Sequence, residues 1–317
     1  MKLRIWIGLI ALYISWGSTY LAIRFAVETM PPFLMAASRF LIAGGVLYLW
    51  RRASGDPSPR QIEWRAAGVV ALLLLIGGNG ALTWSEQYIT SGLAALLVGS
   101  APLWMALIDA LRPFGWPRAT ANAGRSNWLT WTGLILGFCG IILLVEPSFL
   151  SSSHMVSHPI GVIAVLLAAL SWALGSLYNR DARLPESPLL GTGMEMLLAS
   201  AGFLILATLT GEWGRLELSA ITPRSLWSFA YLVVFGAWVG FVAYTWLLRV
   251  APTPLVSTYA YVNPLIAVFI GYLLAGESLT PRILVATLVI VSSVALINIA
   301  SITNRSSPGV VVQSLKE

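Results

Sequence analysis

Two stretches of this sequence decide its fold: TWSEQYITSGLAALLVGSAPL at Thr83–Leu103 and TWLLRVAPTPLVSTYAYVNPL at Thr245–Leu265. Without a gap, an offset of 162 residues superimposes the Thr-Trp pairs that open both stretches and the Pro-Leu pairs near their ends. A second offset, of 156 residues, places SWGSTYLAIR at 15–24 on SWALGSLYNR at 171–180. Matches that keep one order along the chain indicate an internal duplication. The alternative is a coincidence of frequent Trp and Pro residues.

Outward from these stretches, the chain is dominated by long apolar segments. Of its 317 residues, 57% are hydrophobic and only 10% are charged, which excludes a soluble globular domain. A helix needs about 20 residues to cross a hydrocarbon core of roughly 30 Å, and within that core only a helix satisfies its own backbone. We therefore expect an all-α membrane protein of ten transmembrane helices, at residues 5–24, 32–50, 66–85, 91–111, 128–145, 159–179, 188–209, 226–248, 254–274 and 283–302.

The repeat divides these spans into two sets of five. Because five is odd, the second set is expected to lie in the membrane upside down relative to the first, the inverted repeat of many alternating-access transporters. A Ser-rich segment without Lys or Arg separates the sets. We expect a first repeat at residues 1–147, an extracytoplasmic linker at 148–158, a second repeat at 159–302 and a disordered cytoplasmic tail at 303–317.

Basic residues report the orientation of the chain. With the N-terminus inside, fourteen Lys and Arg residues fall in cytoplasmic segments and four on the opposite side, which places both termini in the cytoplasm. The net charge of +6 is spread between the spans, so we expect no nucleic-acid partner. The single cysteine, Cys139, excludes an intrachain disulfide. His154 and His158 are too few ligands to predict a metal, and no cofactor is expected.

Pro102 and Pro264 fall at corresponding positions inside two predicted spans. Proline removes a backbone donor and displaces a carbonyl, and paired interruptions in corresponding helices point to a transporter's binding site. We expect the substrate pathway between these two spans, near Gly99, Ser100, Tyr261 and Asn263. The predicted pathway residues are Trp16, Tyr20, Asn79, Trp84, Gly99, Pro102, Trp172, Tyr178, Tyr244, Trp246, Tyr259, Tyr261, Asn263 and Pro264.

The aromatic residues of this set predict a cavity for aromatic or amphipathic solutes, including cations held over ring faces. Two alternatives stay open. The prolines are also explained as kinks that improve packing, and Trp and Tyr often mark the membrane interface.

Two ionisable residues, Arg39 and Glu195, lie within predicted spans at equivalent positions of the repeat. Charges near the membrane centre cost about 2.5–3.5 kcal/mol on insertion scales, so each needs a partner or water. At 1.5 Å per residue their expected depths differ by about 10 Å, so we pair Arg39 with Glu86 and Glu195 with Arg249. We predict these pairs as gating or coupling charges, either as latches or as groups that flank the substrate. Static or snorkelling charges, and proton coupling through Glu195, are the alternatives.

Six segments occur in order along the chain: SWGSTYLAIR, PPFLMAASRF, LLVGSAPLW, SWALGSLYNR, STYAYVNPLIAV and GESLTP. Together they resemble the EamA family of the drug/metabolite transporter superfamily, most closely its YedA-like branch, over roughly Ile5 to Ile299. The resemblance implies two EamA units and the export or exchange of small metabolites or drugs across the bacterial inner membrane. One departure is visible. Members often carry a Glu after the fourth helix, as Glu277 follows the ninth here, but this chain has Arg112-Pro113-Phe114-Gly115 at that place.

We therefore expect a secondary active transporter that exports a small metabolite, amino acid or drug-like amphipathic solute by alternating access. An intramembrane enzyme and a channel-like or scaffolding helical protein are the alternatives. The sequence has no G-x-S-x-G, H-E-x-x-H or P-loop motif, so we expect no enzyme. The expected partners are a small-molecule substrate and the lipid bilayer. The substrate's identity, the coupling ion and the oligomeric state stay open.

Overall fold

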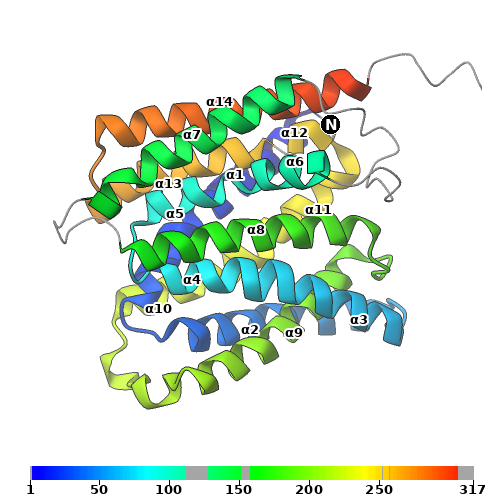
Figure 1. The fold of residues 1–317 in the computed structure, drawn as a ribbon. Coiled ribbons are helices and arrows are strands. Elements are labelled where there is room, and N and C mark those ends of the chain that lie inside the picture. The colour runs from blue at the N-terminus through cyan, green and yellow to red at the C-terminus, as the bar shows by residue number, and fades with distance from the viewer. Residues whose placement is uncertain (1, 112–127, 151–157, 252, 257, 306–317) are drawn as a thin grey trace, which may run out of the picture.

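The computed structural model describes residues 2–111, 128–150, 158–251, 253–256 and 258–305, and every regular element within them is a helix (Figure 1). Most of the expected linker 148–158 and tail 303–317 lies outside the described residues. The α-helices are α1 (Lys2–Val27), α2 (Pro32–Ala53), α3 (Gln61–Val70), α4 (Ala81–Ser85), α5 (Ser91–Val98), α6 (Ala101–Leu111), α7 (Trp128–Leu150), α8 (Pro159–Asp181), α9 (Pro188–Leu209), α10 (Pro223–Tyr231), α11 (Gly240–Val250), α12 (Thr253–Val256), α13 (Tyr259–Ala275) and α14 (Pro281–Arg305). Two π-helical segments, η1 (Ala71–Gly80) and η4 (Leu232–Val239), join α3 to α4 and α10 to α11, and η2 (Glu212–Arg215) and η3 (Leu218–Ala220) are short 3₁₀ helices.

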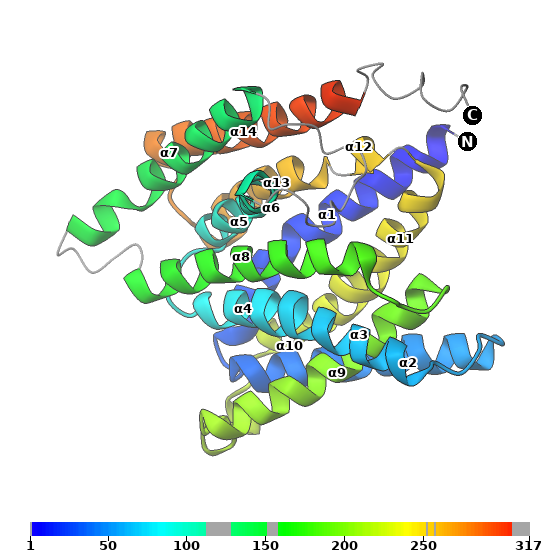
Figure 2. The same cartoon turned by 45° about the vertical axis from the view of Figure 1, so that its right-hand side comes forward.

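Seven helical segments are long and apolar enough to cross a membrane, judged by length and composition over the described residues. The three remaining expected spans coincide with the shorter apolar helices Trp128–Leu144, Tyr259–Ala275 and Pro281–Ile297. The all-α class is thus shown, whereas ten crossings stay a prediction. The start of α1 and the end of α14 lie at the same end of the bundle (Figures 1 and 2).

Proline residues set where several of these helices begin. Five helices, α2, α8, α9, α10 and α14, have Pro as their first residue, where its missing N–H has no intrahelical partner to lose. The start of α2 is also capped by a side chain distant in sequence. The buried carboxylate of Glu212 accepts hydrogen bonds from the backbone N–H groups of Phe33 at 3.2 Å and Leu34 at 2.9 Å. A carboxylate at this position satisfies free donors and complements the helix dipole.

The two halves of the chain pack through corresponding helices. Helix α2 lies against α9 at one side of the molecule and α7 against α14 at the other (Figure 1). Helix α1 packs on α13 and on the α10–η4–α11 segment, and α8 makes the matching contacts with α5, α6 and the α3–η1–α4 segment. Each kind of contact is therefore made once from each half, as a two-fold relation between the halves requires.

Single residues at the crossing of α2 and α9 follow the same two-fold relation. A methyl group on Gly44 would lie 2.9 Å from the carbonyl oxygen of Gly193, so the two backbones touch at this point. Nearby, the hydroxyl of Ser200 donates to the carbonyl oxygen of Ala37 at 2.8 Å. The 156-residue offset relates Gly44 to Ser200 and Ala37 to Gly193, so the two contacts are equivalent under the repeat. Small residues therefore allow close approach at both halves of this crossing.

Candidate functional site

A cavity of about 130 Å³ lies between the two halves. Its wall takes residues from α1, α2, η1, α4, α5, α6, α8, η4, α11 and α13. The space is large enough for a small organic solute or several waters. Both halves of the chain therefore contribute to one site.

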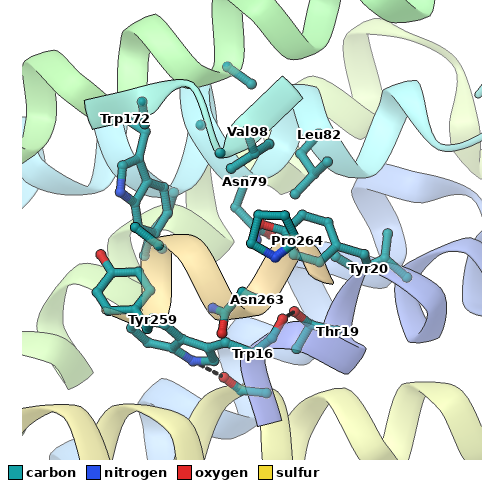
Figure 3. Close-up of a pocket in the computed structure, with 18 of the residues that line it drawn as sticks. Trp16, Thr19, Tyr20, Asn79, Leu82, Val98, Trp172, Tyr259, Asn263 and Pro264 are labelled. Atoms are coloured by element: carbon teal, nitrogen blue, oxygen red, sulfur yellow. Dashed lines mark hydrogen bonds between the residues drawn. The ribbon is translucent and has the colours of Figure 1, made fainter. Parts of the chain in front are cut away.

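Nine of the fourteen predicted pathway residues line this cavity. Figure 3 shows Trp172, Tyr259 and Trp16 at one side of the view, with Asn263 beside Trp16 and Pro264 next to Tyr20 at the other. The nine are Trp16, Tyr20, Asn79, Gly99, Pro102, Trp172, Tyr259, Asn263 and Pro264.

The five other predicted pathway residues lie away from the cavity. Trp246 and Tyr178 are exposed on the outside of the molecule, by 37% and 41%. Trp84 lies against Tyr88 with ring centroids 4.8 Å apart. Tyr244 packs on the ring of Trp16 at 5.2 Å without lining the space, and Tyr261 packs against a core cluster. Repeat symmetry selected Trp84 and Trp246 together, and neither lines the cavity.

Trp16 is the most firmly held ring of the wall. Its indole N–H donates to the carbonyl oxygen of Gly236 at 3.2 Å, and its ring meets Phe241 and Tyr259 edge to face, both at 5.3 Å between centroids. Such edge-to-face contacts fix the ring plane. The result is a preformed aromatic surface on one side of the cavity (Figure 3).

The two repeat-related tryptophans of the wall each pack against a glycine from the other half of the chain, so the two-fold relation also holds inside the site. A methyl on Gly240 would collide with the ring of Trp16, and one on Gly78 would lie 3.0 Å from the ring of Trp172. The offset of 156 residues relates Trp16 to Trp172, and the offset of 162 residues relates Gly78 to Gly240, so the two contacts are equivalent under the repeat. Each tryptophan of the wall therefore needs a glycine in the partner half.

The cavity is walled by two π-helical segments that the sequence did not reveal. Segments η1 and η4 occupy corresponding places, in the α3–η1–α4 and α10–η4–α11 segments, and contribute Gly78, Asn79 and Gly236 to the wall. A π-helix widens the turn and weakens the regular ladder of hydrogen bonds, and such segments are frequent at functional sites. The available signal was the glycine content, at Gly77, Gly78 and Gly80 of the first and Gly236 of the second.

The two proline positions differ more than their alignment suggested. Helix α5 ends at Val98, a turn follows at Gly99 and Ser100, and Pro102 is the second residue of α6. Pro264 instead lies inside the continuous helix α13. The expectation that both prolines sit mid-helix is therefore wrong for the first, because the chain breaks at Gly99 before the proline is reached. A methyl on Gly99 would lie 3.1 Å from the Pro264 ring, so the break packs directly on the proline-containing helix.

Arg39 lines the cavity from α2 and forms no ion pair with any residue that the structure describes. Its side chain is buried, with 3% of the residue exposed, and its Nε and Nη1 atoms have no hydrogen-bond partner in the described part of the chain. Its Nη2 atom lies 3.0 Å from the place where a methyl on Gly236 would be. The guanidinium therefore reaches across the cavity wall toward η4.

The predicted pair between Arg39 and Glu86 is not formed, and this prediction was wrong. Glu86, 1% exposed, follows α4, and neither carboxylate oxygen has a hydrogen-bond partner among the described residues. Its charged neighbours are Arg24, which donates to the Glu86 backbone oxygen at 3.4 Å, and Glu277. Burial raises the pKa of the Glu86 carboxyl well above its usual range, against the opposing effect of Arg24. The depth argument failed because it placed backbones only, whereas the guanidinium of Arg39 extends toward η4 and away from this end.

The second predicted pair, Glu195 with Arg249, cannot be placed as a contact. Glu195 is buried in α9 and takes part in no ion pair with a described residue. The side chain of Arg249 lies outside what the structure describes. Glu195 also lies away from the cavity, so of the two repeat-related charges only Arg39 reaches it.

Glu277, which the sequence marked only through the family resemblance, links the end of α13 to the start of α5. Its carboxylate accepts hydrogen bonds from the backbone N–H and the hydroxyl of Ser91, both at 2.7 Å, and from the N–H of Gly92 at 2.9 Å. Arg24 lies 3.9 Å from the same carboxylate and donates to the carbonyl oxygen of Ile89. The end of α13 therefore caps the start of α5. The expected departure at Arg112 to Gly115 lies outside the described residues.

Comparison with known proteins gives consistent matches over nearly the whole chain. The model of the EamA-like transporter family matches residues 3–146 and again residues 159–299. The Escherichia coli (strain K12) protein named "Uncharacterized inner membrane transporter YedA" is 36% identical over 303 residues, covering 95% of this chain and 92% of that protein. A chloroplastic WAT1-related protein of Arabidopsis thaliana is 26% identical over 92% of this chain and 69% of its own length. A solved crystal structure of 17% identity aligns with a TM-score of 0.61 over 94% of this chain and 98% of that one, which speaks to the fold alone.

Proposed function

The chain belongs to the EamA-like transporter family, and on that premise we propose that it is a secondary active transporter that works by alternating access. It is a membrane transporter with multiple apolar helices. We place it in the bacterial inner membrane, as the name of its Escherichia coli relative suggests. The proposed cargo is a small metabolite, amino acid or drug-like amphipathic solute, and the proposed direction is export.

One observation carries this proposal: a single cavity whose wall is built from corresponding elements of both halves. Each half contributes one π-helical segment, one wall tryptophan and one proline-bearing helical segment. If the halves are inverted copies, rocking one against the other exposes this site to either side of the membrane in turn. The two repeats are then residues 1–147 and 159–302, joined by an outer linker.

Transport by a carrier is tested by counterflow in proteoliposomes. Vesicles loaded with one unlabelled compound from a panel of amino acids, aromatic acids and amines are placed in a trace of the same labelled compound. A carrier gives saturable uptake that internal compound accelerates. Flux that neither saturates nor responds to internal compound indicates a channel, and no flux with any compound contradicts the proposal.

A matched pair of substitutions links such flux to the cavity. Val98 lines the cavity and Val234 faces outward, 38% exposed. We expect Val98→Trp to abolish counterflow by filling the site, and Val234→Trp to leave it unchanged. Equal flux in both variants would show that the solute moves elsewhere.

The proposed orientation is tested by labelling. In a Cys139→Ala background, single cysteines replace Ser153 in the linker and Ser306 in the tail. A membrane-impermeant maleimide should label position 153 in cells with a permeabilised outer membrane, and position 306 only after the inner membrane is opened. The reverse pattern would contradict the proposed topology.

A further inference from the structure

We propose that the cavity binds an organic anion, with its carboxylate on Arg39 and its apolar body against the rings of Trp16, Tyr20 and Tyr259. The inference rests on the proposed transport function and names the substrate class of the same site.

The charge on the cavity wall favours an anion. Arg39 is the only charged side chain that lines the cavity within the described residues. Among the described residues no carboxylate lines it, so a cationic solute would meet a like charge there and no counter-ion. An anionic solute would meet the opposite charge in a low-dielectric site, where the attraction is strong.

The guanidinium of Arg39 is buried, and its contact with the described residues is with the ring of Phe40, 4.9 Å from Cζ to the ring centroid, and not with a carboxylate. Arg39 is 3% exposed, two of its nitrogens have no partner among the described residues, and it is in no ion pair with them. A buried charge without a partner is destabilising. Retaining one beside a cavity is consistent with a partner that arrives as ligand, and the planar fork of Arg suits a carboxylate.

The remainder of the wall bears on the rest of the solute. Trp16 is held in place by its bond to Gly236 and by edge contacts with neighbouring rings, so it offers a rigid apolar face. Asn263 is 5% exposed, lines the cavity, and its Oδ1 has no partner among the described residues. A small solute with one acidic group, a compact apolar body and room for one more polar group fits these features.

The test uses three probes with one ring and three charges: phenylacetate, phenylacetamide and phenethylamine. Each is titrated into purified full-length protein while the melting temperature is followed, because a ligand of the folded state raises it. We expect phenylacetate to give the largest shift. In Arg39→Gln its dissociation constant should rise by about ten- to a hundredfold, the effect of losing one charged hydrogen-bond partner. Arg39→Lys, which keeps the charge and loses the fork, should fall between.

Glu195→Gln is the matched control, because Glu195 occupies the equivalent repeat position, is buried, and lies outside the cavity. It should bind phenylacetate as the wild type does. Without ligand, Arg39→Gln should melt close to the wild type, since it removes a buried charge that has no ion-pair partner among the described residues and loses the contact with the Phe40 ring. A melting temperature close to that of the wild type shows that the variant folds. A larger shift with phenethylamine, equal phenylacetate affinity in Arg39→Gln, or no phenylacetate shift at any concentration would overturn the proposal. Counterflow of a neutral or cationic solute under those results would leave the transport function standing and remove only the anionic class.

Discussion

Replacing Glu277 by alanine tests the contact that joins the end of α13 to the start of α5. The carboxylate accepts two backbone hydrogen bonds and one from a hydroxyl, at 2.7 to 2.9 Å, and its side chain is only 10% exposed. Glu277→Ala removes all three and leaves the donors of Ser91 and Gly92 without this acceptor.

The expected loss of stability depends on the hydrogen bonds that remain at the start of α5. Hydrogen bonds to a charged acceptor contribute about 1.5–3 kcal/mol each, but they are not additive and part of that gain offsets burial of the carboxylate. Thr90 still caps the N–H of Leu93, and Arg24 keeps its bond to the carbonyl of Ile89. We therefore expect a loss of about 2–4 kcal/mol for Glu277→Ala, and about half of that for Glu277→Gln, which keeps one acceptor oxygen.

The assay is equilibrium unfolding in mixed micelles with increasing dodecyl sulfate, followed by tryptophan fluorescence. Glu86→Gln is the matched control, because it changes a neighbouring buried carboxyl whose oxygens have no partner among the described residues. That variant should lose no stability at neutral pH. A Glu277→Ala protein within about 0.5 kcal/mol of wild type, the usual range for an ordinary surface change, would refute the reasoning. So would an equal loss in Glu86→Gln, because the cap would then not be the cause.

Three further predictions follow from contacts of single residues. Gly44→Ala should destabilise the protein by about 1–3 kcal/mol through overpacking at the α2–α9 crossing. Gly45→Ala, whose added methyl would have nothing within 4 Å, should stabilise it by up to about 1 kcal/mol. Unfolding of both variants in the same micelles measures the difference, and equal effects would contradict the close approach of α2 and α9 at Gly44. Because burial raises the pKa of Glu86 in the folded state, the folded state binds this proton more tightly than the unfolded chain does. The stability that this proton contributes is greatest below the ordinary carboxyl pKa and is lost as pH rises toward the raised value. Glu86→Gln should therefore flatten the dependence of unfolding free energy on pH in that window, and an unchanged slope would show that Glu86 is not its source. Gly240→Ala should displace the Trp16 ring, and counterflow at saturating solute should fall more than the melting temperature does; a change in melting temperature alone would separate the ring from the site.

The helical class and the location of the cavity could be predicted from the sequence because both depend on composition and order. Uncharged runs of sufficient length leave a helix as the only way to satisfy the backbone in lipid. Gly99, Asn263 and Pro264 line the cavity as expected, since a break and a proline interrupt two helices that cross there. That they form a substrate pathway stays a prediction.

Side-chain direction could not be predicted in the same way. Trp84 and Trp246 share a repeat position with each other, yet neither lines the cavity, because a repeat fixes the place along a helix and leaves open the face that meets its neighbours. The π-helical segments escaped notice for a related reason. Apolar runs such as ALLLLIGGNG at Ala71–Gly80 have the same hydropathy in an α- or a π-helix, so only the glycines carried a signal.

Arg39 and Glu195 show how a symmetric scaffold acquires a polarity. They occupy equivalent positions and carry opposite charges, and both are buried. Helices α2 and α9 cross at small residues, so their backbones are held in nearly equivalent places. The difference therefore lies in the side chains: the longer guanidinium reaches the cavity, and the carboxylate does not. A cavity formed by two similar halves would otherwise offer a solute two equivalent poses, and a single cation at one side makes one pose favourable. On this argument, the double substitution Arg39→Glu and Glu195→Arg should bind phenylacetate more tightly than Arg39→Gln does, because an arginine at the equivalent backbone position has the same reach. Binding no tighter than in Arg39→Gln would contradict it.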